Sequence, residues 1–336
     1  MREKKRIWIF VLLTVAMFSF LGASVARNPS ASDEPIKETE AEVKSDICNL
    51  LLLGKDNVAD LCDVMMLVSL NSTSGQLSVV QIPRDTYFSY TASDYKKINA
   101  ASHRLGGAEK FKKKLSDALG VPIDGYIEFD LDFVRDAVDM VGGVELDVPC
   151  DMHYDDPQQN LSIHLKKGKQ MLMGEDAVAF VRFRSGYRRA DLSRMDAQKL
   201  FLAAFSRAFS ERVGVSEIPR MIWLATKHLK TDVRLDTMIS VAVGMRNLPG
   251  ENITVLTLPG EEVQSEYSGA WYYILSRDGC ADAIEKYLTD GVYSGFDPNG
   301  LFTDKSRKNF LEIYQRKIFA VPYTFTALMK DGISIE

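Results

Sequence analysis

Short apolar runs alternate with helical patterns along most of the chain, and this alternation limits the possible folds more than any other feature. Apolar runs of strand length lie at residues 49–53, 64–70, 76–82, 144–148 and 253–258. Helical patterns lie between them, at residues 106–119, 129–141, 219–229 and 235–247. The turn-rich residues 71–75 indicate a hairpin between the second and third strands. The chain is therefore expected to be α/β, with a mixed central sheet flanked by helices in a sandwich.

An uncharged apolar segment stands at the N-terminus. Residues 2–6 are basic and residues 7–26 carry no charge. Twenty residues at about 1.5 Å each match a hydrocarbon core of about 30 Å, so a transmembrane anchor is expected. The basic flank would stay in the cytoplasm, which places the rest of the chain outside. The alternative is a cleaved signal peptide, for which residues 24–26 are an acceptable small-residue site.

Composition divides the whole chain into segments. Residues 1–6 are expected to be a cytoplasmic tail and residues 7–26 the anchor. Residues 27–46, rich in Pro, Ser and charge, are expected to be a flexible linker. Residues 47–290 are expected to form the main domain, with residues 291–336 as a C-terminal extension. The formal net charge of −5 argues against a nucleic-acid surface, because phosphate neutralisation needs a basic face.

Cysteine and histidine give little sign of a metal site. No CxxC or zinc spacing connects the four cysteines, Cys48, Cys62, Cys150 and Cys280. A disulfide between Cys48 and Cys62 and four small buried thiols are both compatible with the sequence. The histidines are scattered, which predicts no histidine metal site: His103, His153, His164 and His228.

Residues 178–199 change abruptly from apolar to basic and then to helical. Five arginines fall within thirteen residues of this segment: Arg182, Arg184, Arg188, Arg189 and Arg194. If residues 178–184 form a strand, Arg182 and Arg184 lie on one face. A helix is expected to begin near Asp191 or Ser193, both good N-caps, and it would place Arg194 and Gln198 on one face.

This geometry predicts a phosphate or pyrophosphate site, because guanidinium forks grip phosphate oxygens and a helix N-terminus favours an anion. The alternative is an exposed turn of solvated arginines. Arg188 and Arg189 are expected to be solvated under both interpretations.

Three further groups carry possible chemistry. Asp56 follows the first strand and Asp63 opens the second, where two carboxylates would suit a divalent cation such as Mg²⁺. Ordinary loop aspartates are the alternative. Arg84 and Asp85 end the third strand, either as a local salt bridge or as a further phosphate ligand, and Lys97 is another candidate cation.

Seven motifs in order carry a resemblance to a known family. They are GKD, CDVMMLVSLN, IPRDT, KINAA, VGGVELDVP, GEDAVAFVRFR and RADLSRMDAQK. In this combination the chain resembles the LytR-CpsA-Psr family of bacterial cell-envelope proteins. The motifs span residues 49–205, and a looser similarity covers residues 253–260.

The resemblance implies an α/β domain outside the cytoplasm, held at the bacterial cell membrane by one N-terminal helix. A hydrophobic cleft would hold a polyprenyl chain, with its pyrophosphate at an arginine-lined mouth beside Mg²⁺ or Mn²⁺. The implied activity is transfer of a glycan with its phosphate from polyprenyl pyrophosphate to a peptidoglycan hydroxyl. The glycan itself, teichoic acid, capsule or another polymer, is left open.

The resemblance also assigns residues by position. Asp56 and Asp63 match the metal carboxylates, and Asp191 matches a base for the acceptor hydroxyl. The remaining matches contact the pyrophosphate, and Arg84 is also assigned a catalytic role: Arg84, Lys97, Arg182, Arg184, Arg194 and Gln198.

Three alternatives stay open beside this assignment. Capping the helix that carries Arg194 is an equal alternative role for Asp191. The apolar stripe of residues 133–141 either lines a lipid cleft or packs the core, and core packing is the expectation. The alternative function is a non-catalytic sensor or regulator that binds lipid-linked pyrophosphate, since Leu61 stands where the family usually has arginine.

Overall fold

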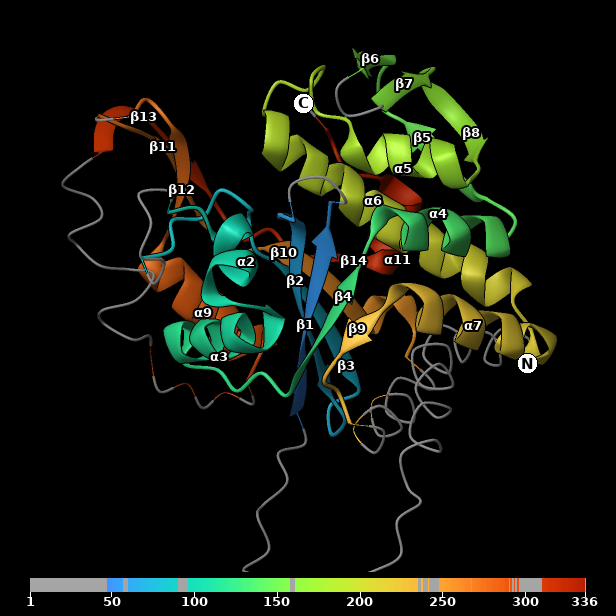
Figure 1. The fold of residues 1–336 in the computed structure, drawn as a ribbon, viewed down its shortest axis with the longest axis horizontal. Helices are drawn as coiled ribbons and strands as arrows, with labels where there is room; N and C mark the ends of the chain where they lie inside the picture. Colours follow the sequence, from blue (N-terminus) through green and yellow to red (C-terminus); the bar gives the residue numbers. More distant parts are fainter. Residues whose placement is uncertain are drawn as a thin grey trace, which may run out of the picture.

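Seven strands form a mixed sheet at the centre of the computed structural model (Figure 1). The structure describes residues 47–56, 60–89, 96–157, 161–234, 237, 241, 248–266, 268–289, 291, 293, 295 and 310–335. Among these residues no helix is both long and apolar enough to cross a membrane. The expected anchor and linker, residues 7–46, lie outside the described residues, as does almost all of the expected helix 235–247.

The central sheet has the strand order β14-β10-β3-β2-β1-β4-β9. Its strands are β1 (Ile47–Lys55), β2 (Cys62–Asn71), β3 (Gln76–Gln81), β4 (Gly125–Phe129), β9 (Lys230–Thr231), β10 (Ile253–Thr257) and β14 (Tyr323–Thr324). The β1–β4 and β3–β10 pairs are parallel and the other pairs are antiparallel. The predicted mixed sheet and the predicted hairpin are confirmed, and Asn71 holds the hairpin turn by accepting from the Thr73 and Ser74 amides.

Helices cover both faces of this sheet, because its strands carry apolar side chains on both sides. In β1, Leu51 and Leu53 face one apolar cluster, whereas Leu50 belongs to another. One face is covered by α2 (Ala101–Leu105), α3 (Ala108–Leu119) and α9 (Arg277–Tyr287). The other face is covered by α4 (Leu131–Met140), α5 (Gly174–Arg182), α6 (Ala190–Arg212), α7 (Ile218–His228) and α11 (Phe325–Asp331).

The helix ends follow local sequence signals. In α4 the Asp130 carboxylate accepts from the Phe133 amide, and the predicted stop at Gly142 and Gly143 is observed. Gly143 has a φ of +90°, and a Cβ there would lie 2.9 Å from the sulfur of Met171. The chain therefore turns sharply after α4.

Two small antiparallel pairs lie beyond α5 and α6. The first joins β5 (Val144–Val148) to β8 (Gly168–Leu172), and the second joins β6 (Met152–Asp156) to β7 (Leu161–Leu165). In the second pair His153 lies directly opposite His164. These two histidines are eleven positions apart in sequence, so the expectation of scattered histidines is wrong for this pair.

Residues 310–335 add to two sheets. β13 (Phe310–Ile318) pairs with β11 (Gly260–Ser265), which also pairs with β12 (Trp271–Leu275), and this three-stranded sheet lies beside the central one (Figure 1). β14 pairs with β10 at the edge of the central sheet, and Leu328 of α11 is buried. Much of the segment expected as a C-terminal extension thus takes part in the main fold.

The four cysteines are free thiols. Cys48 lies opposite Leu70 and Cys62 opposite Lys55 in the β1–β2 ladder, so the two are not paired with each other. Cys62 and Cys280 are buried, as expected of small apolar side chains.

Candidate active site

A β-bulge near the start of β2 sets the direction of Asp63. Cys62 pairs with Lys55 and Val64 with Gly54, which leaves Asp63 as the extra residue on its strand. Glycine is required opposite, because a Cβ on Gly54 would lie 2.9 Å from the Cβ of Val64. The bulge places the Asp63 carboxylate beside Arg84, three positions past the end of β3.

Two carboxylates and two guanidiniums, from three separate segments, meet at this point. Nη1 of Arg84 donates to Oδ1 of Asp63 at 2.7 Å, and its Nε lies 3.0 Å from Oδ1 of Asp191. Nη2 of Arg194 lies 2.8 Å from the same Asp191 oxygen and donates to the main-chain oxygen of Asp63 at 3.2 Å. The four residues Asp63, Arg84, Asp191 and Arg194 are called the arginine cluster below.

The cluster is largely shielded from water. Arg194 is only 4% exposed, and its Nε is buried without a hydrogen-bond partner among the described residues. Burial lowers the pKa of Arg194. Burial also opposes the charges of Arg84 and Asp63, but the facing groups outweigh it, raising the pKa of Arg84 and lowering that of Asp63. Fixed, poorly hydrated charges of this kind are typical of sites that bind or transform anions.

Arg182 ends a helix and Arg184 lies two residues beyond it, so neither is on a strand. The predicted strand 178–184 is wrong, because residues 174–182 form α5. The helix buries Gly174, Ala177 and Phe180 at a spacing of three, and acidic residues in its first turn favour its N-terminus. Arg182 is the last helical residue and is half-buried, whereas Arg184 is exposed.

Arg184 acts electrostatically on both Asp63 and Arg194. The excess positive charge predicted for this segment is therefore present, although it is delivered by the C-terminal end of α5.

Asp191 does not cap α6. The helix begins at Ala190, its N-cap is Arg189 without a side-chain hydrogen bond, and Asp191 and Ser193 both lie inside the first turn. The expected N-cap role is wrong for both residues. The Asp191 carboxylate instead holds Arg84 and Arg194, and its side chain is 15% exposed. Arg189, expected to be solvated, is half-buried, and Arg188 is exposed as expected.

An apolar cavity of about 240 Å³ adjoins the arginine cluster. Two lining residues are sequence neighbours of cluster residues, since Val64 follows Asp63 and Gln198 lies one turn beyond Arg194. A third, Val181, directly precedes Arg182. Gln198 is 6% exposed and donates to the main-chain oxygen of Val181 at 3.4 Å. Arg194 and Gln198 therefore share a buried face of α6, as predicted.

The cavity lies between the sheet and the helices α4, α6 and α7, which supply most of its walls. Its lining exposes apolar atoms throughout, including the aromatic rings of Phe129, Phe133, Phe201, Phe205 and Phe209. The expectation that the α4 stripe only packs the core is partly wrong. Phe133, Val134 and Ala137 line the cavity, whereas Val138 is fully buried in the core.

Lys97 and Asp85 form a separate ion pair next to the cluster. Nζ of Lys97 lies 2.7 Å from Oδ1 of Asp85 and 5.8 Å from the centre of the Tyr272 ring. The Asn99 amide donates to the main-chain oxygen of Arg84, which ties the two segments together. The Asp85 carboxylate therefore pairs with Lys97. The predicted local salt bridge would have paired it with Arg84.

The carboxylates expected to bind metal occupy neighbouring strand ends. Asp56 directly follows β1 and is half-buried, and its amide donates to the main-chain oxygen of Leu61. Oδ1 of Asp63 is engaged by Arg84, but Oδ2 lies 3.9 Å from Nη1 of Arg194, beyond hydrogen-bond distance. A hard cation that takes one or two carboxylates and completes its shell with phosphate oxygens fits this donor set.

Two features were not foreseen from the sequence. Lys199 is 4% exposed, and its Nζ is held by Asp196 at 2.7 Å on the face of α6 towards Tyr323. The sequence did carry a signal for this ion pair. Lys199 stands between Gln198 and Leu200 in an apolar helix, and Asp196 lies three positions earlier, at the spacing of a helical pair. Lys55 also joins Asp60 and Glu128 in an ion-pair network.

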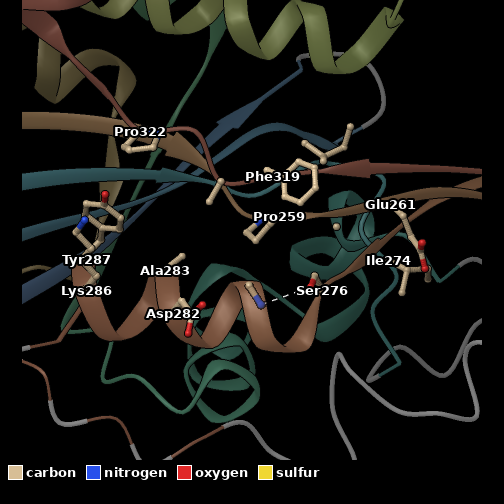
Figure 2. A pocket seen from close by; sticks show the side chains of 14 residues that line it. Pro259, Glu261, Ile274, Ser276, Asp282, Ala283, Lys286, Tyr287, Phe319 and Pro322 are labelled. Carbon is tan, nitrogen blue, oxygen red and sulfur yellow. Dashed lines mark hydrogen bonds between the residues drawn. The ribbon is translucent and has the colours of Figure 1, made fainter.

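A larger cavity, of about 670 Å³, lies elsewhere, between α9 and the three-stranded sheet (Figure 2). Its charged lining residues are Glu261, Asp282 and Lys286, so carboxylates outnumber cations and no guanidinium contributes. Such a lining disfavours a pyrophosphate. The arginine cluster and the adjoining apolar cavity remain the better candidate for the active site.

Known proteins share both the sequence pattern and the fold. The model of the LytR_cpsA_psr family matches residues 14–288. The polyisoprenyl-teichoic acid–peptidoglycan teichoic acid transferase TagV of Bacillus subtilis is 25% identical over 290 residues, which cover 80% of this chain and 74% of that protein. The corresponding TagU transferase of Bacillus cereus is 30% identical over 265 residues, covering 77% of this chain and 84% of that protein.

A solved structure agrees with the sequence matches. The crystal structure of B. subtilis TagV superimposes with a TM-score of 0.60 at 25% identity, covering 73% of this chain and 98% of that one. The mixed sheet flanked by helices is therefore the architecture of these proteins too. The family model spans most of the chain, and the chain belongs to the LytR_cpsA_psr family.

Proposed function

We propose that this chain transfers a glycan, together with its phosphate, from a polyprenyl-pyrophosphate carrier to a peptidoglycan hydroxyl. The observation that carries the proposal is the apolar cavity whose rim adjoins the buried arginine cluster. This arrangement suits a ligand with a long apolar tail and a charged pyrophosphate head. The names of the relatives make teichoic acid the first glycan to test.

The donor would bind with its isoprenoid chain in the cavity and its pyrophosphate at the guanidiniums. Arg84 and Arg194 are already oriented by Asp63 and Asp191, so little reorganisation is needed when the anion arrives. Arg182 and Arg184 add positive charge from the end of α5, and Lys97 and Gln198 complete the pyrophosphate contacts. Arginine suits this role because its charge persists under all physiological conditions.

In the chemical step, the acceptor hydroxyl oxygen attacks the phosphorus that carries the glycan. A new P–O bond forms, and the bond from that phosphorus to the bridging oxygen breaks. Polyprenyl phosphate leaves with the bridging oxygen, and the hydroxyl proton passes to the Asp191 carboxylate. The guanidiniums of Arg84 and Arg194 neutralise charge on the phosphoryl oxygens in the transition state.

Asp56 and Asp63 would hold Mg²⁺ or Mn²⁺. When bound, such an ion neutralises phosphate charge and helps to align the pyrophosphate. The protein's own part is to keep Oδ2 of Asp63 available while Arg84 engages Oδ1. A domain outside the cytoplasm, held at the bacterial membrane by residues 7–26, would meet both the lipid carrier and the wall.

The test is turnover by the full-length chain in detergent with a polyprenyl-pyrophosphate-linked teichoic acid precursor, peptidoglycan fragments and Mg²⁺. Release of polyprenyl phosphate is expected, and Arg84→Ala should reduce it by about 10²- to 10³-fold, as loss of one oxyanion-binding group does. Arg207→Ala, on the exposed face of α6, is the matched control and should retain activity.

A second function is favoured by one residue. The resemblance to the LytR-CpsA-Psr family leads us to expect arginine at position 61, where this chain has Leu61, so one guanidinium is missing. A non-catalytic sensor or regulator would bind the lipid pyrophosphate tightly and release no polyprenyl phosphate. Tight donor binding without turnover in the same assay would replace the transferase proposal with this one.

A further inference from the structure

The β6–β7 hairpin has one apolar and one polar face. Met152, Ile163 and Leu165 are buried in the core, so the intervening positions point outwards. Those outward positions carry metal-binding or hydrogen-bonding side chains: His153, Asp155, Ser162 and His164. Exposure to solvent alone does not explain why two facing imidazoles and a carboxylate occupy this face.

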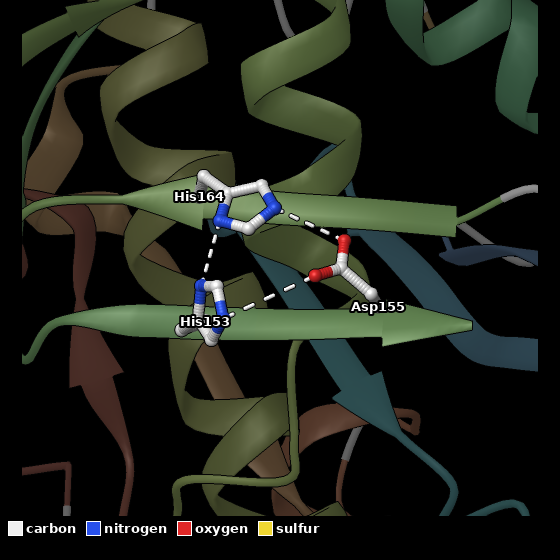
Figure 3. A group of neighbouring side chains, drawn as sticks. All are labelled: His153, Asp155 and His164. Carbon is white, nitrogen blue, oxygen red and sulfur yellow. Dashed lines mark hydrogen bonds and ion pairs between the residues drawn. The ribbon is translucent and has the colours of Figure 1, made fainter. Parts of the chain in front are cut away.

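The three titratable side chains converge on one point (Figure 3). Nδ1 of His153 and Nδ1 of His164 are 2.7 Å apart, and Nε2 of His164 lies 3.0 Å from Oδ1 of Asp155. Nε2 of His153 lies 3.9 Å from Oδ2 of the same carboxylate. One donor atom from each residue lies within 4.8 Å of the others.

We propose that His153, Asp155 and His164 form a binding site for a transition-metal ion of the Zn²⁺ class. Ligands about 2.1 Å from a tetrahedral ion lie roughly 3.4 Å from one another, so side-chain shifts of about 1 Å would complete the geometry. Two imidazoles and one carboxylate leave a fourth position for water or an anionic ligand. This donor set favours zinc over Mg²⁺, which prefers oxygen ligands.

Neighbouring groups hold the ligands in place. The Ser162 hydroxyl donates to Oδ1 of Asp155 at 2.7 Å, which fixes the carboxylate beside the imidazoles. Nε2 of His164 contacts the same oxygen, and Nδ1 of His164 contacts His153 across the β6–β7 pair. The three side chains are therefore already gathered before any ion binds.

The site is separate from the arginine cluster. It lies on the outer face of a hairpin whose inner face packs against α5, the helix that ends at Arg182 (Figure 1). Bound metal would cross-link β6 to β7 and stiffen the support of α5. The inference does not depend on the transferase activity.

The test is calorimetric titration of the tag-free full-length chain in detergent, after metal removal, with ZnCl₂ in excess MgCl₂. One saturable zinc site per chain is expected. His153→Asn and His164→Asn should each weaken zinc binding at least tenfold, since removal even of outer-sphere support costs about 10- to 100-fold. Asp63→Asn should leave zinc binding unchanged, which separates this site from the proposed Mg²⁺ carboxylates.

His103→Asn is the matched control. His103 is also exposed and paired with a carboxylate, Asp60 at 2.9 Å, but among the described residues no imidazole pairs with it as His153 pairs with His164. Circular dichroism and the metal-free melting temperature check that the variants fold, and Asp155→Asn gives an independent ligand removal. The proposal is overturned if the wild type shows no saturable zinc binding, or if folded His164→Asn and Asp155→Asn bind zinc as tightly as the wild type.

Discussion

Replacing Arg194 by methionine should destabilise the protein strongly. The side chain is 4% exposed, and it holds Asp191 at 2.8 Å and the Asp63 main-chain oxygen at 3.2 Å. Methionine keeps most of the length and the apolar contacts but removes the charge. Asp63 and Asp191 would then share only Arg84 within the arginine cluster.

The magnitude follows from burial. Removing one partner of a buried ion pair costs about 3–5 kcal/mol. Asp191 keeps its contact with Arg84 at 3.0 Å, so the lower end, about 3 kcal/mol, applies. At about 2 °C per kcal/mol for a large domain, the melting temperature should fall by roughly 6 °C.

The assay is thermal unfolding of the full-length chain in detergent, followed by circular dichroism. Arg207→Met is the control on the same helix, because Arg207 is half-exposed and makes one i,i+4 pair with Glu211 at 3.2 Å. That pair is worth about 0.5 kcal/mol or less, so its loss should shift the midpoint by about 1 °C. Equal shifts in the two variants, or a more stable Arg194→Met, would refute the description of the cluster as a buried, mutually dependent set of charges.

Three further predictions concern the same region. The folded-state pKa of Asp63 is lowered, so its contribution to stability is present above the unfolded pKa of about 3.9 and is lost as pH falls below it. In urea unfolding, the difference in unfolding free energy between wild type and Asp63→Asn should therefore be present at pH 7 and narrow below about pH 4. Val134→Phe should narrow the apolar cavity and weaken use of long-chain donors more than short-chain donors, measured as separate KM values. Asp191→Asn should lower kcat by about 10²- to 10⁴-fold, and a folded variant with unchanged kcat would contradict its role as base.

Four of the longer strands of the central sheet were predictable because each is apolar and of strand length: β1, β2, β3 and β10. β4 was not predicted, and the predicted strand 144–148 is β5, which lies outside the central sheet. Residues 49–53 and 64–70 predicted β1 and β2, although the structure extends both by a few residues. The hairpin followed from the polar residues between β2 and β3. Two-residue strands such as β9 and β14 carry no pattern that sequence can reveal, since pairing with longer neighbours defines them.

The α5 segment shows how a local pattern misleads. The letters VAFVRFR alternate as a strand would, but Gly174, Ala177 and Phe180 repeat at a helical spacing and pack into the core. The alternating segment begins at residue 178, after the first turn of the helix, where Glu175 and Asp176 favour the helix N-terminus. Arg184 still acts electrostatically on Asp63 and Arg194, because that interaction does not depend on which element carries the arginine.

Other features of the site depend on tertiary contacts that cannot be predicted from a single sequence. The bulge at Asp63 appears only once β1 and β2 are in register. Likewise, His153 and His164 become neighbours only through the register of the β6–β7 hairpin. Asp191 was expected either to cap its helix or to act as a base. Its contacts with Arg84 and Arg194 show a third arrangement, in which it orients two guanidiniums.

The most direct test of the central claim is to identify both products of a single turnover by mass spectrometry. The full-length chain would receive a polyprenyl-pyrophosphate-linked glycan, peptidoglycan fragments and Mg²⁺. Attack at phosphorus predicts polyprenyl monophosphate and a glycan joined to the acceptor by a phosphodiester. Polyprenyl pyrophosphate together with a glycan joined directly through its sugar carbon would mean attack at carbon, and would contradict the phosphotransferase account.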